Sequence, residues 1–89
     1  MEQHSIEITY CVPSDYSPRA VSAARDLFSN YQHVISDLRL LTGSKGIYDV
    51  RVDREFVYSN DETNRHAEDG DVLEIFRRIV GPDVSVFGT

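Results

Sequence analysis

Apolar and polar residues alternate in four short stretches of the chain, a pattern typical of strands with one buried face. The stretches run over 5–10, 34–41, 46–52 and 55–59. In the first, Ile6, Ile8 and Tyr10 share one face. Only Asp53 and Arg54 separate the last two stretches, so we predict a hairpin with a two-residue turn, although the turn lacks the glycine that such turns favour.

Two other stretches carry apolar residues at helical spacing. We expect the first helix to be capped by Ser17 and to have Pro18 at its first position. Its apolar positions are Ala20, Val21, Ala24, Leu27, Phe28 and Tyr31. We expect Asp71 to cap the second helix, with Glu74 in capping-box register, and Gly81 to end it. Its apolar stripe consists of Val72, Ile75, Phe76, Ile79 and Val80.

The predicted order is β-α-β-β-β-α, with a polar, mobile loop over 60–70. A right-handed crossover makes the first two strands parallel. This order predicts an α/β (α+β) domain of thioredoxin-like architecture, with a four-stranded mixed sheet and two helices. The alternative is a ferredoxin-like fold, which needs a last strand at the alternating residues Val84, Val86 and Phe87.

The length of 89 residues predicts a single domain over 1–89. The formal net charge of -6, without a Lys/Arg cluster, argues against binding to nucleic acid or to anionic membranes. The N-terminus does not resemble a signal peptide, and no apolar run reaches the ~20 residues of a membrane span. A single cysteine cannot form an internal disulfide, so we expect a cytoplasmic protein.

The candidate for chemistry is Cys11-Val12-Pro13-Ser14, which follows the first strand. Ligand sites of open α/β sheets lie at such strand ends, so the thiol of Cys11 is expected at an accessible rim. Thiol chemistry needs the thiolate, and Arg19 is the nearest candidate cation to stabilise it. The alternative is that Cys11 is an inert, buried packing residue.

The segment 8–20 resembles the N-terminal signature of the selenoprotein W-related family. It reads Ile-Thr-Tyr-Cys-Val-Pro-Ser-Asp-Tyr-Ser-Pro-Arg-Ala. That family carries Tyr-Cys-x-x-Cys, or selenocysteine in the last place, followed by Arg-Ala. Segments 42–53 and 78–83 are also similar to the family's loop, hairpin and ending. The resemblance implies a thioredoxin-like fold and thiol–disulfide redox work, with glutathione or thioredoxin-type partners.

The chain departs from the family pattern because Ser14 occupies the place of the second cysteine or selenocysteine. A hydroxyl cannot resolve a mixed disulfide, so any redox activity would be monothiol chemistry at Cys11. Ser14 would then hydrogen-bond the thiolate, and Arg19 would aid electrostatically. A second departure is Lys45, at a place where many relatives have glycine. The competing hypothesis is a binding module that kept the fold and lost the redox activity. We expect no cofactor and no metal, because His4, His33 and His66 are scattered.

Overall fold

A computed structural model describes residues 2–59 and 70–88 of the chain. The strands are β1 (His4–Cys11), β2 (Ile35–Gly43), β3 (Tyr48–Val52) and β4 (Glu55–Ser59). The helices are α1 (Ser17–Tyr31), the short 3₁₀ turn η1 (Gln32–Val34) and α3 (Asp71–Val80). The expected order of strands and helices is therefore confirmed, with η1 as an addition. Apart from Gly70, the expected loop over 60–70 lies outside the described residues.

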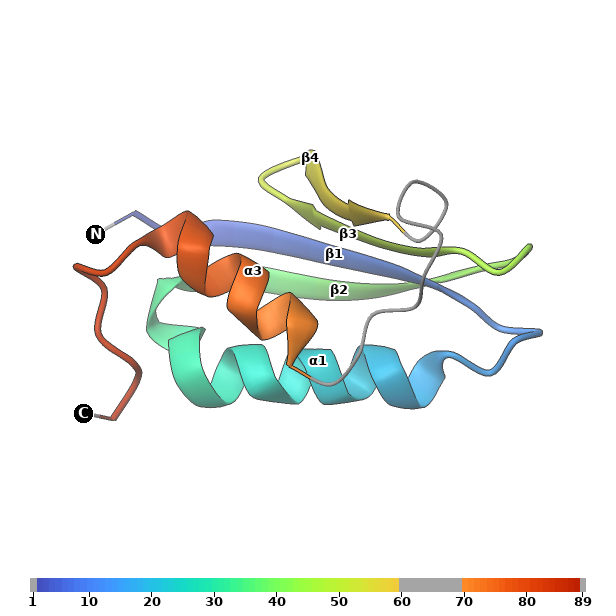
Figure 1. Ribbon diagram of the computed structural model, residues 1–89, viewed down its shortest axis with the longest axis horizontal. Helices are drawn as coiled ribbons and strands as arrows, with labels where there is room; N and C mark the ends of the chain where they lie inside the picture. The colour runs from blue at the N-terminus through green and yellow to red at the C-terminus, as the bar shows by residue number, and fades with distance from the viewer. Residues whose placement is uncertain (1, 60–69, 89) are drawn as a thin grey trace.

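The four strands form one mixed sheet in the order β2-β1-β3-β4. β1 pairs parallel with β2 and antiparallel with β3, which in turn pairs antiparallel with β4. β2 and β4 are thus the two edges, and α1 runs alongside β2 in the view of Figure 1. The described tail, 81–88, contains no strand. The last strand of the ferredoxin-like alternative is therefore missing, and the thioredoxin-like arrangement holds.

Both helices pack against the same face of the sheet and close one apolar core. The residues buried there are Ile6, Ile8, Ala20, Ala23, Leu27, Tyr31, Val34, Ile35, Tyr48, Val50, Val52, Tyr58, Val72 and Phe76. β1 and β3 contribute every second residue, as the alternation predicts, whereas β2, an edge strand, buries only Ile35 and leaves Leu40 exposed. The helices contribute most of their apolar stripes, but the predicted stripe positions Val21, Phe28 and Ile79 are exposed. Cys11 is not a member of this core, although it is buried.

Both helices start differently from the prediction. Tyr16 precedes α1 in place of a capping Ser17, and the Ser17 hydroxyl donates to Asp15 at 3.4 Å. Gly70 precedes α3, and Asp71 is already the first helical residue. Gly70 has a left-handed φ of 89°, which glycine adopts without steric cost. The two expected side-chain caps were therefore wrong by one residue.

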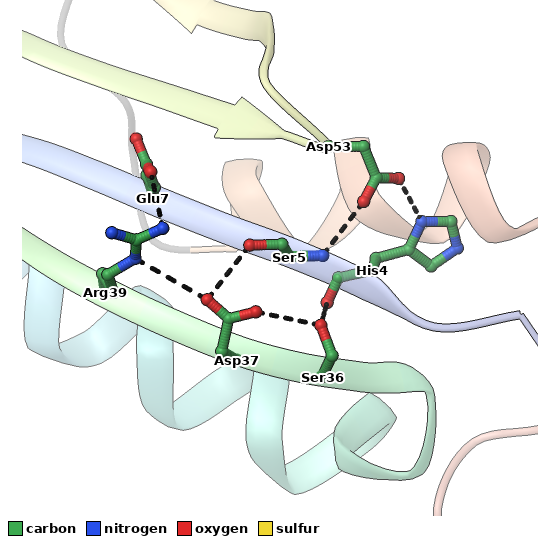
Figure 2. A network of polar contacts seen from close by, with 7 residues as sticks. All are labelled: His4, Ser5, Glu7, Ser36, Asp37, Arg39 and Asp53. Atoms are coloured by element: carbon green, nitrogen blue, oxygen red, sulfur yellow. Dashed lines mark hydrogen bonds and ion pairs between the residues drawn. The ribbon is translucent and has the colours of Figure 1, made fainter.

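The predicted hairpin turn is confirmed, and its backbone is unusual. Asp53 and Arg54 have φ of 53° and 74°, the left-handed values found in mirror-image hairpin turns. Asp53 compensates by side-chain bonding: its carboxylate accepts the backbone N–H of Ser5 at 3.0 Å and lies 2.6 Å from Nδ1 of His4 (Figure 2). The turn is thereby fastened to the beginning of β1.

Candidate thiol site

Cys11 is the last residue of β1 and lies opposite Gly43, the last residue of β2. The chain then turns sharply, because the N–H of Val12 donates to the carbonyl of Gly43 at 3.0 Å and the N–H of Asp15 donates back to Val12 at 2.9 Å. Asp15 has a positive φ of 56°. The turn 12–15 therefore folds back beside the end of the sheet before α1 begins.

A second loop, 44–47, lies at the same end of the sheet as the turn 12–15, away from the chain termini (Figure 1). Its close approach to the sheet requires glycine at position 43. A Cβ there would lie 2.8 Å from Cγ2 of Ile47 and 3.1 Å from Cγ2 of Thr9. The parallel pairing of β1 and β2 thus brings two loops together that lie far apart in the sequence.

The sulfur of Cys11 lies between these two loops. Its S–H donates to the hydroxyl of Ser14 at 3.1 Å, and the backbone N–H of Gly46 donates to the sulfur at 3.1 Å. Cys11 is only 1% exposed. The expected accessible rim position was therefore wrong, because both loops fold back over the strand end. The expectation of inert packing fits no better, since the sulfur's hydrogen-bond partners are polar.

These hydrogen bonds hold the pKa of Cys11 below its ordinary value. The bond with the Ser14 side chain lowers the pKa most, burial works in the opposite direction, and the backbone N–H of Gly46 lowers it further. Backbone N–H groups of Ser14 and Ile47 add to the lowering. Each of these groups favours the charged thiolate over the thiol. The site therefore favours the form of sulfur that acts as a nucleophile.

Arg19, the expected electrostatic aid, is directed elsewhere. Its guanidinium lies over the ring of Tyr16, with Cζ 5.6 Å from the ring centroid. Its backbone carbonyl accepts the hydroxyl of Tyr48 at 3.4 Å, and burial raises the pKa of Tyr48 to about 12. The lowered pKa of Cys11 thus comes from Ser14 and the loop 44–47 rather than from Arg19. The remaining motif residues, Val12 and Pro13, form the exposed outer side of the turn.

Sequence reasoning assigned no role to Gly46, which supplies one of the two short contacts to the sulfur. Its donor is a backbone N–H, which every residue except proline possesses, so residue type carries no signal for it. The nearest signal was the pair of glycines at 43 and 46, which was interpreted only as a loop. Lys45, between them, is exposed and has a left-handed φ of 61°. Glycine adopts that conformation without the steric cost that a lysine side chain carries.

A polar network lies at the other end of β1, and the sequence did not predict it (Figure 2). Beyond the contacts of Asp53, the hydroxyl of Ser5 donates to Asp37 at 3.0 Å. Arg39 bridges Glu7 at 3.2 Å and Asp37 at 3.6 Å. These pairs tie β1 to β2 on the face of the sheet opposite the core. We assign the network a structural role.

Within residues 2–59 and 70–88, no three His, Cys, Asp or Glu side chains gather so that they could hold a metal ion. His66 lies outside these ranges. The helices of the same ranges include none long and apolar enough to cross a membrane.

The comparisons with known proteins give one family model and two solved structures of similar fold. Residues 5–78 match the Rdx family. A solved structure of a selenoprotein W-related protein from Vibrio cholerae is similar in fold, with a TM-score of 0.81 and 15% identity, over 90% of this chain and 100% of that chain. A crystal structure of a protein from Bordetella parapertussis is also similar, with a TM-score of 0.79 and 18% identity, over 88% and 99% of the two chains. No curated protein sequence matches this chain significantly.

The two structures are too distant in sequence to show more than the fold. The family match covers β1 to most of α3 and includes both loops around Cys11. The Rdx family is thioredoxin-like and associated with redox chemistry. This chain belongs to the Rdx family.

Proposed function

We propose that this protein forms and releases mixed disulfides through Cys11, in monothiol chemistry with glutathione or with a partner protein. The polar setting of the sulfur carries the proposal: the Ser14 hydroxyl and the Gly46 N–H both lie 3.1 Å from it and favour the thiolate. Membership in a redox-associated family supports the same chemistry.

One cycle starts with a partner protein that carries glutathione on a cysteine. The Cys11 thiolate attacks the glutathione sulfur, a new S–S bond forms to Cys11, and the partner leaves as a thiolate. Ser14 has no sulfur with which to resolve this bond. A free glutathione thiolate therefore attacks the bound glutathione sulfur, which releases oxidised glutathione and restores the Cys11 thiolate. The partner cysteine is reduced to a thiol, one free glutathione is oxidised, and it leaves joined to the glutathione that the partner carried.

This cycle needs no bound cofactor, since glutathione acts as a co-substrate. It needs a compartment that keeps glutathione reduced, and we therefore place the protein in the cytoplasm. With a net charge of -6, neither nucleic acid nor a membrane surface is part of the proposal.

Incubation with oxidised glutathione at mildly alkaline pH, followed by mass spectrometry of the intact protein, tests the proposal. We expect one glutathione adduct on the wild type and none on the Cys11→Ser variant. Adding reduced glutathione should then remove the adduct. A wild-type protein that stays unmodified after long incubation contradicts the proposed chemistry.

The second candidate is a binding module without redox activity, favoured by the 1% exposure of Cys11 and by Ser14 in the place of a resolving thiol. The pH dependence of Cys11 alkylation separates the two. A midpoint below that of an ordinary thiol supports the redox function. A midpoint at the ordinary value, together with no glutathione adduct, supports the binding module.

A further inference from the structure

The surroundings of Cys11 favour the reactive thiolate, yet they also cover the sulfur and block access to it. A thiolate must approach a disulfide in line with the bond it breaks, yet Cys11 is 1% exposed. No disulfide reaches the sulfur while both loops are in place. One of them must move before Cys11 reacts.

The turn 12–15 is the more firmly held of the two. Backbone hydrogen bonds join Val12 to Gly43 at 3.0 Å, Asp15 to Val12 at 2.9 Å and Tyr16 to Cys11 at 3.2 Å. The loop 44–47 has a longer backbone bond, from Ile47 to Ser44 at 3.3 Å, besides the contact of its Gly46 with the sulfur.

The backbone of the loop 44–47 also carries a conformational cost. Lys45 is a non-glycine residue at a φ of 61°, and Gly46 follows at 74°. A lysine in the left-handed region is unfavourable, so the closed loop is strained at Lys45. The turn 12–15 also holds a positive φ, 56° at Asp15, but aspartate tolerates this region better than lysine because its short polar side chain can hydrogen-bond locally. The loop 44–47 is therefore the element that opens at least cost.

We propose that the loop 44–47 is a lid over Cys11, held closed by the hydrogen bond from the Gly46 N–H to the sulfur, and that Cys11 reacts only when this lid opens. The inference rests on the proposed function for its importance. Its physical basis is separate: a charged thiolate accepts a hydrogen bond more strongly than a neutral thiol. Ionisation of Cys11 and closure of the lid therefore stabilise each other.

This coupling has a measurable consequence. The thiolate forms easily in the closed state, but only the open state reacts. Suppose that closing the lid makes the thiolate tenfold more favourable relative to the thiol. By linkage, the thiolate then makes the closed lid tenfold more favourable relative to the open lid, so the fraction of thiolate with an open lid falls tenfold. Cys11 should therefore combine a low titration midpoint with a low maximal rate, whereas an exposed activated thiol combines a low midpoint with a high rate.

Alkylation with iodoacetamide across a pH series measures both quantities. The thiolate forms a bond to the reagent's carbon, and iodide leaves. Wild-type Cys11 should reach a plateau rate at least about tenfold below that of the urea-unfolded chain. Low, non-denaturing urea should hardly change this rate, because a local opening exposes little surface.

Gly46→Ala weakens the lid. The added Cβ would meet nothing within 4 Å, so the cost is the positive φ of 74° alone. That cost destabilises the closed lid and increases the fraction of open lid, so the alkylation rate should rise about tenfold across the pH range. The pH at which the rate reaches half of its maximum should stay the same or rise. Gly81→Ala is the control for a backbone cost elsewhere in the chain. Its Cβ is equally unhindered, its φ of 83° and ψ of 173° lie in a region almost exclusive to glycine, so its cost is at least as large, and it lies beyond α3. It should leave the rate unchanged.

The inference is overturned if the plateau rate of the wild type matches that of the unfolded chain, or if Gly46→Ala and Gly81→Ala react alike. The proposed function fails separately. If alkylation is faster in Gly46→Ala but neither protein forms a glutathione adduct, the lid is supported and the proposed redox cycle is contradicted. If the wild type forms a glutathione adduct and is alkylated as fast as the unfolded chain, the redox cycle is supported and the lid is contradicted.

Discussion

Replacing Gly43 with alanine should destabilise the fold at the end of the sheet where Cys11 lies. The new Cβ would sit 2.8 Å from Cγ2 of Ile47 and 3.1 Å from Cγ2 of Thr9. Both are branch atoms of β-branched side chains, so moving either one requires rotation of χ1 away from a preferred rotamer or a shift of the backbone. Such overpacking costs about 1–3 kcal/mol, while replacing glycine in a strand recovers about 0.5–1 kcal/mol. The difference spans roughly 0–2.5 kcal/mol, and we expect a net loss near its middle, about 1 kcal/mol, in the free energy of unfolding.

Urea unfolding followed by circular dichroism measures this loss, and a double-mutant cycle with Ile47→Ala tests its origin. Ile47→Ala removes the Cγ2 atom that lies closest, so Gly43→Ala should cost less in that background. Displacement of Ile47 also moves the loop that covers the sulfur, so Gly43→Ala should speed alkylation of Cys11. Unchanged stability and an unchanged alkylation rate would together refute the close packing described here.

Three further changes have expected outcomes. Ser14→Ala removes the hydrogen bond that lowers the pKa of Cys11 most, so this pKa should rise. The pH dependence of thiolate absorbance measures it, and an unchanged pKa would contradict the assigned contact. Arg54→Gly relieves a φ of 74° and should raise the free energy of unfolding by up to about 1 kcal/mol in urea titrations, whereas a loss would show that the turn is not strained. The hydrogen bond with His4 lowers the pKa of Asp53 in the folded protein. The ionised Asp53 carboxylate therefore stabilises the fold above the ordinary pKa of an aspartate, and this stabilisation is lost as the pH falls through the lowered pKa of the folded state. In the Asp53→Asn variant, the free energy of unfolding should therefore fall less steeply as the pH drops below about 4. The difference from the wild type should be less than about 1 kcal/mol, because the Asp53 side chain is half exposed. The same pH dependence in both proteins would contradict this prediction.

The elements of this fold were predictable because their signals are local. Alternation in the strands and helical spacing in α1 and α3 follow from the geometry of neighbouring residues. The two helix starts were less predictable, since a hydroxyl or carboxylate near the first turn has several possible partners. Ser17 donates to Asp15, and Gly70 precedes α3 with a left-handed φ that no periodicity reveals.

The network around His4 and Asp53 shows a different limit. Its two residues are 49 positions apart, and their contact exists because the hairpin turn returns to the beginning of β1. The sequence carries an acidic residue in a turn and a histidine near the N-terminus, each of which is common. Their 2.6 Å contact depends on the register between β1 and β3, in which Ile6 pairs with Val52.

Local patterns along the chain were enough to predict the order of the elements, the family and the position of the only cysteine at the end of the first strand. They did not reveal that Cys11 is covered or which groups hydrogen-bond its sulfur, because both depend on contacts between segments far apart in the chain. Gly46 donates to the sulfur across 35 positions of sequence, through a backbone N–H that is the same in almost every residue type. The parallel pairing of β1 and β2, which the order of the elements predicts, brings the two loops to one end of the sheet. Which backbone N–H meets the sulfur there depends on how the loop 44–47 folds back, and no local pattern reveals that.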